Sequence, residues 1–133
     1  MPVGQNTAHI LVVEDARMNQ ILVEALLGDA GYEVTVVGDG LAGVDAARVG
    51  NFDAVLMDLE MPVMDGMEAT LQIRGLDGSA GRIPIVAMTA HSVANEAQRC
   101  RDVGMDDFIT KPIDPDQLLR VVARWTGGTD GAV

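Results

Sequence analysis

Five short apolar runs, rich in β-branched residues and separated by longer helix-like stretches, constrain the fold more than any other feature of this sequence. Short runs that are apolar throughout are typical of strands buried on both faces of a parallel sheet. We interpret as strands the runs His9–Val13, Glu33–Val37, Ala54–Met57, Ile83–Met88 and Asp107–Thr110. Strands that alternate with helices predict an α/β domain whose parallel sheet is covered by helices on both faces.

The stretches between these runs show helical periodicity and signals that end helices. In the first stretch, one stripe at helical spacing is apolar, which predicts that this stripe faces the sheet; its residues are Met18, Leu22, Ala25 and Leu26. Gly31 follows at a position where a helix is expected to end, and Asp114 is the expected N-terminal cap of the last helix. The other predicted helices span Leu41–Val49, Met67–Arg74 and Val93–Val103.

The composition of the 133-residue chain favours one globular domain and excludes several classes of protein. A net charge of -11 argues against a nucleic-acid-binding surface and against electrostatic attraction to anionic membranes. No apolar run approaches the ~20 residues that span a bilayer. The single cysteine, Cys100, cannot form an internal disulfide or a cysteine-based zinc site, so a reducing, cytoplasmic location is the simplest interpretation.

The charges are unevenly distributed along the chain. Residues 1–68 contain 12 of the 20 acidic residues but only two of the nine basic ones. Eight basic residues are arginines, and Lys111 is the one lysine. A chain that otherwise uses arginine therefore singles out Lys111 as a position where a compact, mobile ammonium group matters.

Polar residues directly follow four of the predicted strands. Glu14 and Asp15 follow the first strand, Asp58 the third, Thr89 the fourth and Lys111 the fifth. In open parallel sheets the ligand site lies beyond the carboxyl ends of the strands, so we expect these side chains to meet at one edge. The resulting site would hold three carboxylates, one hydroxyl and one ammonium group.

Three neighbouring carboxylates repel one another unless a cation lies among them. Mg²⁺ fits such a site because it prefers oxygen ligands, commonly one or two carboxylates together with waters and phosphate oxygens. Thr89 and Lys111 could then bind further phosphoryl oxygens, and Asp58 could act as a nucleophile that forms an aspartyl phosphate. Phosphoryl transfer requires mainly positioning and charge neutralisation, which these groups supply.

Four segments in this order resemble the receiver domains of two-component response regulators. They are Ile10–Asp15 (ILVVED), Val55–Gly66 (VLMDLEMPVMDG), Met88–Ala90 (MTA) and Lys111–Pro112 (KP). The resemblance covers about residues 8–126 and leaves residues 127–133 as a flexible tail or the start of a linker. It implies a flavodoxin-like (βα)5 fold, with a doubly wound five-stranded parallel sheet of strand order 2-1-3-4-5, and a cis peptide bond before Pro112.

The resemblance also implies roles for acidic residues at the carboxyl edge of the sheet. Asp58 matches the phosphoacceptor and is implied, with Asp15, as a direct Mg²⁺ ligand. Glu14 is implied to act on the ion through water. Glu60 is implied as a further metal ligand through its backbone carbonyl.

Thr89 and Lys111 match the catalytic hydroxyl and lysine that bind the phosphoryl group in this family. Thr89 and Phe108 match its switch residues, although Phe108 also fits a plain core position and lacks the hydroxyl that a tyrosine would bring. Glu60 and His91, two residues after Asp58 and Thr89, are expected to lie beside the attacking water. We therefore expect Glu60 and His91 to tune autodephosphorylation.

The segment Glu14–Gln20 (EDARMNQ) is most similar to receivers attached to hybrid histidine kinases. The implied function is a phosphorelay switch, in which Asp58 takes a phosphoryl group from a phosphohistidine, the domain changes conformation, and the phosphate is slowly lost. The implied partner is a histidine kinase or a histidine phosphotransfer domain that docks near the first helix. The oligomeric state stays open.

A second interpretation is an enzyme, a Mg²⁺-dependent phosphohydrolase with Asp58 as the nucleophile and Glu60 as the second acid. The acidic pair directly after the first strand and the missing cap domain count against it. A flavodoxin-like nucleotide binder is a weaker third interpretation. The chain has no glycine-rich phosphate loop, and its carboxylates would repel a nucleotide in the absence of a metal ion.

Overall fold

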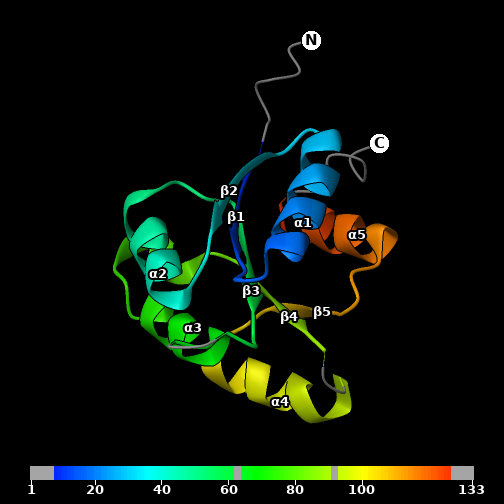
Figure 1. Ribbon diagram of the computed structural model, residues 1–133. Coiled ribbons are helices and arrows are strands. Elements are labelled where there is room, and N and C mark those ends of the chain that lie inside the picture. The colour runs from blue at the N-terminus through cyan, green and yellow to red at the C-terminus, as the bar shows by residue number, and fades with distance from the viewer. Residues whose placement is uncertain (1–7, 62–63, 91–92, 127–133) are drawn as a thin grey trace.

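The computed structural model describes residues 8–61, 64–90 and 93–126. Its centre is a parallel sheet of five strands in the order β2-β1-β3-β4-β5 (Figure 1). The strands are β1 (His9–Val13), β2 (Glu33–Val37), β3 (Ala54–Asp58), β4 (Ile85–Thr89) and β5 (Asp107–Thr110). The predicted fold class and strand order are confirmed.

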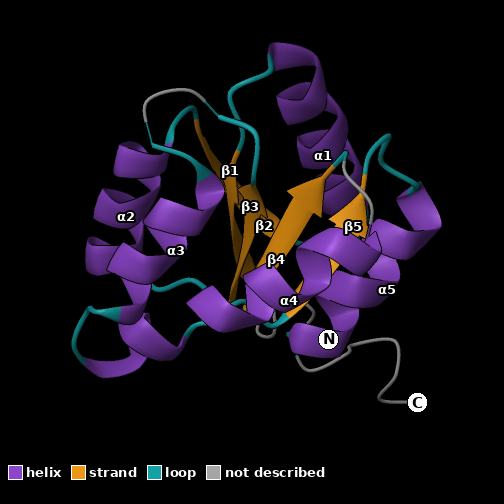
Figure 2. Cartoon of the chain, turned by 90° about the horizontal axis from the view of Figure 1, so that it is seen from below, coloured by secondary structure: helices purple, strands orange, loops and turns teal. Residues whose placement is uncertain are grey.

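Helices cover both faces of this sheet (Figure 2). Helices α1 and α5 pack on one face, and α2, α3 and α4 pack on the other. Their bounds are α1 (Arg17–Asp29), α2 (Gly40–Val49), α3 (Gly66–Arg74), α4 (Val93–Val103) and α5 (Pro115–Trp125), with a short 3₁₀ helix, η2 (Gly78–Arg82), after α3. Both helical layers exclude water from the sheet, which leaves its edges as the accessible parts.

Successive residues of a strand point to opposite helical layers. In β1, Leu11 and Val13 belong to the core cluster under α2 and α3, whereas Ile10 and Val12 belong to the cluster under α1 and α5. All four side chains are fully buried. Burial on both faces explains why this strand is apolar throughout rather than alternately apolar and polar.

The fourth strand begins at Ile85, two residues later than predicted. The cause is Pro84, which has no backbone N–H to donate to a neighbouring strand. Its carbonyl still accepts a hydrogen bond from the N–H of Val55 at 2.8 Å. Pro84 therefore leads into the strand without being part of it.

Strands β3 and β4 each extend one residue further than predicted, to Asp58 and Thr89. Asp58 is paired with Met88, and Thr89 is paired with Thr110. Because both residues belong to the sheet, their backbones are held by neighbouring strands. The two side chains therefore project from a rigid part of the fold.

The apolar stripe predicted for α1 is largely wrong. Val23 and Leu27 are fully buried, whereas Met18 is 78% exposed and Leu22 is 38% exposed. The helix has apolar residues on two adjacent stripes, so its periodicity does not decide which stripe faces the sheet. Packing of α1 against β1, β2 and α5 buries Val23 and Leu27. Of the predicted stripe, Leu26 is partly buried and packs against the core, whereas Met18, Leu22 and Ala25 are exposed.

Several local predictions are confirmed. Gly31 has a φ of 100°, a conformation that glycine adopts readily and other residues rarely do, and it follows the end of α1. Asp114 caps α5 by accepting a hydrogen bond from the Asp116 N–H at 3.2 Å. The peptide bond between Lys111 and Pro112 is cis.

No helix within the described ranges combines the length and apolar character needed to cross a membrane. The predicted tail, residues 127–133, lies outside the described residues. The domain boundary at residues 8–126 remains a prediction.

Candidate functional site

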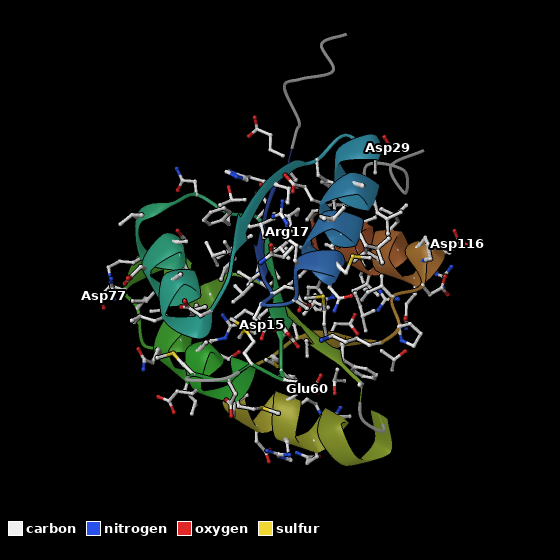
Figure 3. The ribbon with its side chains drawn as sticks, in the orientation of Figure 1. Asp15, Arg17, Asp29, Glu60, Asp77 and Asp116 are labelled. Carbon is white, nitrogen blue, oxygen red and sulfur yellow. The ribbon has the colours of Figure 1, made fainter. Side chains whose placement is uncertain are left out.

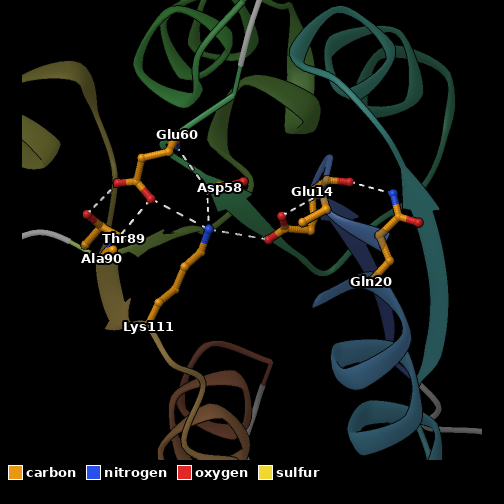
Figure 4. A network of polar contacts seen from close by, with 8 residues as sticks. Glu14, Gln20, Asp58, Glu60, Thr89, Ala90 and Lys111 are labelled. Atoms are coloured by element: carbon orange, nitrogen blue, oxygen red, sulfur yellow. Dashed lines mark hydrogen bonds and ion pairs between the residues drawn. The ribbon is translucent and has the colours of Figure 1, made fainter. Parts of the chain in front are cut away.

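The sheet brings the polar residues singled out in the sequence to one edge. Asp58 and Thr89 are the last residues of β3 and β4, Lys111 follows β5, and Glu14 and Asp15 follow β1. Figure 4 shows Glu14, Asp58 and Glu60 around Lys111, with Thr89 beside Glu60. Because neighbouring parallel strands end at the same edge, residues far apart in the sequence meet there, as expected.

Part of the acid excess lies far from this edge. In Figure 3, Asp15 and Glu60 lie near the ends of the central strands, whereas Asp29, Asp77 and Asp116 lie at the periphery. The negative net charge is therefore partly surface charge and partly charge gathered at the site.

Lys111 is the cation at the centre of the site. Its Nζ atom lies 2.7 Å from Asp58 Oδ1, 3.6 Å from Glu60 Oε1 and 3.7 Å from Glu14 Oε1. Burial lowers the pKa of the ammonium group, but the hydrogen bond to Asp58 and the surrounding negative charges outweigh burial and raise that pKa above its usual value. Lys111 therefore carries its positive charge at neutral pH.

Glu14, Asp15 and Asp58 form an acidic cluster in which one carboxylate oxygen from each residue lies within 4.8 Å of the others. Glu14 and Asp58 are fully buried, while Asp15 is exposed. Within the described part of the chain, Glu14 Oε1 and Asp58 Oδ2 are buried without a hydrogen-bond partner. Burial, assisted by the charge of Asp58, raises the pKa of Glu14 to about 7. Such a set of oxygen atoms fits a hard divalent cation such as Mg²⁺.

Backbone and side-chain hydrogen bonds hold Glu14 in place. Its N–H donates to the Val37 carbonyl at 3.0 Å, and its Oε2 accepts from the Ala16 N–H at 3.0 Å. Gln20 Nε2 donates to the Glu14 carbonyl at 2.6 Å. The sequence did not identify Gln20 as a supporting residue, although it lies in the segment that resembles hybrid-kinase receivers. The turn into α1 therefore fixes the first acid of the cluster.

The Glu60 side chain contacts groups of the site that the sequence did not connect with it. Its Oε2 accepts a hydrogen bond from the Thr89 hydroxyl at 3.0 Å, and its Oε1 accepts from the Ala90 N–H at 3.4 Å (Figure 4). Its backbone N–H donates to Asp58 Oδ1 at 3.0 Å. Glu60 therefore links the ends of β3 and β4 through both its backbone and its side chain.

Phe108, the predicted switch aromatic, lies on β5 opposite Ala87 of β4. It is half-buried and packs against the core cluster that contains Cys100 and Met105. This position is compatible with both predicted roles, the switch and the core residue. His91 lies outside the described residues.

Gly66 allows the segment after β3 to pass close to the site. A side chain at Gly66 would collide with the backbone carbonyl of Asp58. Asp65, directly before it, caps α3 by accepting from the Glu68 N–H at 2.9 Å. The Asp-Gly pair within the quoted motif is the sequence signal for this close approach.

Comparison with known proteins shows which family carries this arrangement. The chain matches the model of the response regulator receiver domain over residues 10–123. It is 45% identical over 128 residues to the sensor protein GacS of Pseudomonas syringae pv. syringae, covering 95% of this chain and 14% of that protein. It is 38% identical over 119 residues to hybrid signal transduction histidine kinase I of Dictyostelium discoideum, covering 85% of this chain and 7% of that protein. The chain thus spans a small part of these relatives.

Solved structures share the fold. The receiver domain of the sensor histidine kinase PA1611 from Pseudomonas aeruginosa, which has a magnesium ion coordinated in the active site cleft, superposes with a TM-score of 0.84 at 40% identity, covering 91% of this chain and 98% of that one. The receiver domain of Ssk1 from Saccharomyces cerevisiae, crystallised with the histidine phosphotransfer protein Ypd1, is matched with a TM-score of 0.85 at 26% identity, covering 92% of this chain and 90% of that one.

Proposed function

This chain belongs to the family of response regulator receiver domains, which act in two-component signalling, and from that premise we propose that it is a phosphoacceptor switch of a phosphorelay. In the proposed reaction, a carboxylate oxygen of Asp58 attacks the phosphorus atom of a phosphohistidine on the partner. The phosphorus–nitrogen bond breaks and its electron pair stays with the imidazole. The product is an acyl phosphate on Asp58.

The observation that carries this proposal is the environment of Asp58. Its carboxylate is fully buried at the end of β3, with the Lys111 ammonium 2.7 Å away and the Thr89 hydroxyl at the end of the neighbouring strand. Lys111 is suited to neutralise one phosphoryl oxygen, and the Thr89 hydroxyl to donate to another. Such positioned charges and donors are the main requirement of phosphoryl transfer.

The acidic cluster supports a Mg²⁺ requirement. Asp15, Asp58 and the Glu60 carbonyl would hold the ion directly, and Glu14 would act through water. The ion would supply positive charge to the oxygens of the transferred group. The buried oxygens of Glu14 and Asp58 that have no hydrogen-bond partner in the described residues fit this role.

Thr89 and Phe108 are the residues proposed to transmit phosphorylation. Movement of the Thr89 hydroxyl toward the phosphoryl group would alter space near Phe108, which lies on the adjacent strand. The face formed by α4, β5 and α5 would then present the two states to a partner. Glu60 and His91 are proposed to set the rate at which water removes the phosphate.

The proposed partner is a histidine kinase or a histidine phosphotransfer domain that docks on the α1 patch, which we define as the exposed apolar residues Met18, Ile21 and Leu22. These side chains are 78%, 50% and 38% exposed, respectively. The α1 patch starts three residues after Asp15, so a partner bound there would bring its histidine close to the site. Exposed groups of apolar side chains are typical of interaction surfaces. The chain has a single cysteine, Cys100, and therefore no internal disulfide, which supports a cytoplasmic location for this exchange.

Mass spectrometry under conditions that preserve acyl phosphates tests the proposed function. With Mg²⁺ and acetyl phosphate, the chain should gain one phosphoryl group, and Asp58→Ala should gain none. Asp77→Ala, which removes an exposed acid away from the site, is the matched control and should behave as the wild type. Many cycles of hydrolysis of a generic phosphate ester would instead favour the phosphohydrolase.

Transfer from candidate donors tests the relay itself. Purified histidine kinases and histidine phosphotransfer domains, labelled on their histidine, should lose the label to this chain when they are its partners. The same donors should keep it when Asp58→Ala is supplied. A chain that reacts with acetyl phosphate but with none of these donors would contradict the phosphorelay role while leaving the phosphoacceptor intact.

A further inference from the structure

The Glu60 carboxylate contacts the groups that the proposed function assigns to the phosphoryl group. The Thr89 hydroxyl donates to it at 3.0 Å, and the Lys111 ammonium lies 3.6 Å from it. The neighbouring Ala90 N–H donates to the same carboxylate at 3.4 Å. A hydroxyl, an amide and an ammonium group thus converge on one anion that the chain itself supplies (Figure 4).

A carboxylate and a phosphoryl group compete for such donors. Both are anions whose oxygens accept charge-assisted hydrogen bonds. The Thr89 hydroxyl has one hydrogen, so it cannot donate fully to Glu60 and to a phosphoryl oxygen at the same time. The two anions would also repel each other if both stayed beside Lys111.

Only the side chain of Glu60 has to move for the donors to become free. Its backbone is fixed, because its N–H donates to Asp58 Oδ1 at 3.0 Å and the preceding residue, Leu59, donates to the Met88 carbonyl at 3.0 Å. The side chain itself is 32% exposed, whereas Thr89 is fully buried. The carboxylate therefore reaches a buried hydroxyl from the rim and can return to solvent without a change in the sheet.

We propose that the Glu60 side chain is an internal latch that occupies the phosphoryl position of the unphosphorylated domain and must be displaced before Thr89 and Lys111 can bind a phosphoryl group. This inference rests on the proposed function and adds regulation of the same site. The latch holds the Thr89 hydroxyl in its resting position. It therefore disfavours both the entry of a phosphoryl group and the movement of Thr89 that follows.

Three substitutions separate the charge of the latch from its length. Glu60→Ala removes the carboxylate, Glu60→Gln keeps the shape and one acceptor without the charge, and Glu60→Asp keeps the charge on a shorter side chain. Glu68→Gln is the matched control, because Glu68 lies on α3, outside the site, and its carboxylate contacts Gln72 at 3.1 Å. Thermal unfolding establishes that each variant is folded.

The first measurement needs neither metal nor phosphoryl group. In ¹H–¹⁵N spectra, the Ala90 amide proton of Glu60→Ala should move upfield, because the hydrogen bond to the carboxylate is lost. Glu60→Gln should show a smaller shift, and Glu68→Gln none. An Ala90 resonance that moves no more in Glu60→Ala than in Glu68→Gln would show that there is no latch.

The second measurement is binding of beryllofluoride, a phosphoryl mimic, in the presence of Mg²⁺. Glu60→Ala should bind it roughly two- to tenfold more tightly than the wild type, the factor that corresponds to one net hydrogen bond. Glu60→Gln should be intermediate. Glu60→Asp should also bind beryllofluoride more tightly than the wild type, because its shorter carboxylate no longer reaches the Thr89 hydroxyl and the Ala90 N–H together. Glu68→Gln should resemble the wild type. Acetyl phosphate should phosphorylate the variants in the same order of rate.

The outcomes distinguish the latch from the function on which it rests. If the wild type and all variants form no adduct at Asp58, the proposed function fails and the latch fails with it. If adducts form but Glu60→Ala binds beryllofluoride as the wild type does, or more weakly, the latch alone is wrong. Tighter binding together with the Ala90 shift supports both.

Discussion

Each end of the sheet holds a largely buried basic side chain, but the two side chains contact different kinds of acceptor. At the amino end, Arg74 donates to four acceptors, at 2.7 to 3.1 Å: the carbonyls of Gly81, Ile83 and Gly104 and the carboxylate of Asp106. At the carboxyl end, Lys111 lies within 4 Å of three carboxylates. The positive charge of Arg74 thus faces one carboxylate, whereas the positive charge of Lys111 faces three.

The difference follows from the chemistry of the two side chains. A guanidinium group is a planar fork of donors, which suits a fixed set of carbonyls around it. An ammonium group is a compact charge on a flexible stem, which can move from one anion to another. The amino end is therefore arranged to hold its shape, and the carboxyl end keeps an excess of negative charge that favours the arrival of a cation.

Arg74 connects segments that are distant in the sequence. It joins α3 to the loop before β4 and to the loop between α4 and β5. The carboxylate that it binds, Asp106 Oδ2, also accepts from the Ile85 N–H at 2.9 Å. These contacts align the starts of β4 and β5, whose ends carry Thr89 and Lys111. The contacts of Arg74 at the amino end thereby help to position Thr89 and Lys111 at the carboxyl end.

Replacement of Arg74 should have the largest effect on stability. Arg74→Met removes the side-chain donor of three backbone carbonyls and leaves the Asp106 carboxylate with the Ile85 N–H but without its positive partner. It should lower the free energy of unfolding by about 3 kcal/mol. Urea unfolding measures this. Arg48→Met is the matched control, because the Arg48–Asp45 pair is exposed on α2, and its loss should cost less than about 0.5 kcal/mol. Equal effects of the two substitutions would remove the contrast between the two ends.

Replacement of Lys111 should impair the reaction and spare the fold. Lys111→Ala removes the charge that meets the phosphoryl group, and should slow phosphorylation by acetyl phosphate about 100-fold, since hydrogen bonds to charged groups contribute about 1.5–3 kcal/mol. Phosphorylation is followed by mass spectrometry, and folding by circular dichroism. Arg120→Ala, at an exposed position of α5, should leave the rate unchanged. Unfolding of Lys111→Ala in the presence of Mg²⁺ would contradict this prediction.

The excess of carboxylates should appear in the pH dependence of stability. The pKa of Glu14 is about 7 in the folded chain and 4.5 as its ordinary value, so between these values the folded state holds a proton that the unfolded state has released. In metal-free buffer, the free energy of unfolding should therefore fall by about 3 kcal/mol as the pH rises from 4.5 to above 7. Urea unfolding at a series of pH values measures this fall.

Glu14→Gln is the variant that isolates this effect. It keeps the size of the side chain and cannot release the proton, so its stability should lack the fall across this range. At pH 8 without metal, it should therefore be more stable than the wild type. If the free energy of unfolding changes with pH in the same way for the wild type and for Glu14→Gln, then ionisation of Glu14 does not destabilise the folded chain, and the prediction is wrong.

The sequence predicted the carboxyl edge better than it predicted the helices around it. Asp58, Thr89 and Lys111 could be located because each directly follows a run of buried strand residues, and parallel strands leave few alternatives for where their ends meet. The contact between Glu60 and Thr89 could not be predicted, because it depends on the rotamer of the Glu60 side chain, which the spacing of residues in the sequence does not determine. The acceptors of Arg74 are mostly backbone carbonyls, which leave no trace in the sequence.

The α1 error has a different physical origin. A helix with apolar residues on two adjacent stripes offers the sheet two faces, and periodicity alone does not rank them. Packing buries Val23 and Leu27, and the stripe of Met18 and Leu22 remains at the surface. The apolar residues that were predicted to build the core are therefore available to a partner.

Substitutions in the α1 patch should have the smallest of these effects. They test whether the rim of the carboxyl end, like the site itself, takes part in phosphoryl transfer. Ile21→Ser should slow transfer from a partner histidine phosphotransfer domain about fivefold, the loss of about 1 kcal/mol at an interface. It should leave urea unfolding and the reaction with acetyl phosphate unchanged, because the side chain is 50% exposed and lies outside the core. Leu71→Ser, equally exposed on α3, is the matched control.

The comparison of Ile21→Ser with Leu71→Ser decides between two roles for the α1 patch. If both variants receive phosphoryl groups at the same rate, the exposed residues of α1 are ordinary surface residues and the partner docks elsewhere. If Ile21→Ser is slowed with the partner but not with acetyl phosphate, the defect lies in docking and not in the site. The function of the carboxyl end would then depend both on the excess of carboxylates in the site and on the exposed apolar side chains of the α1 patch at its rim.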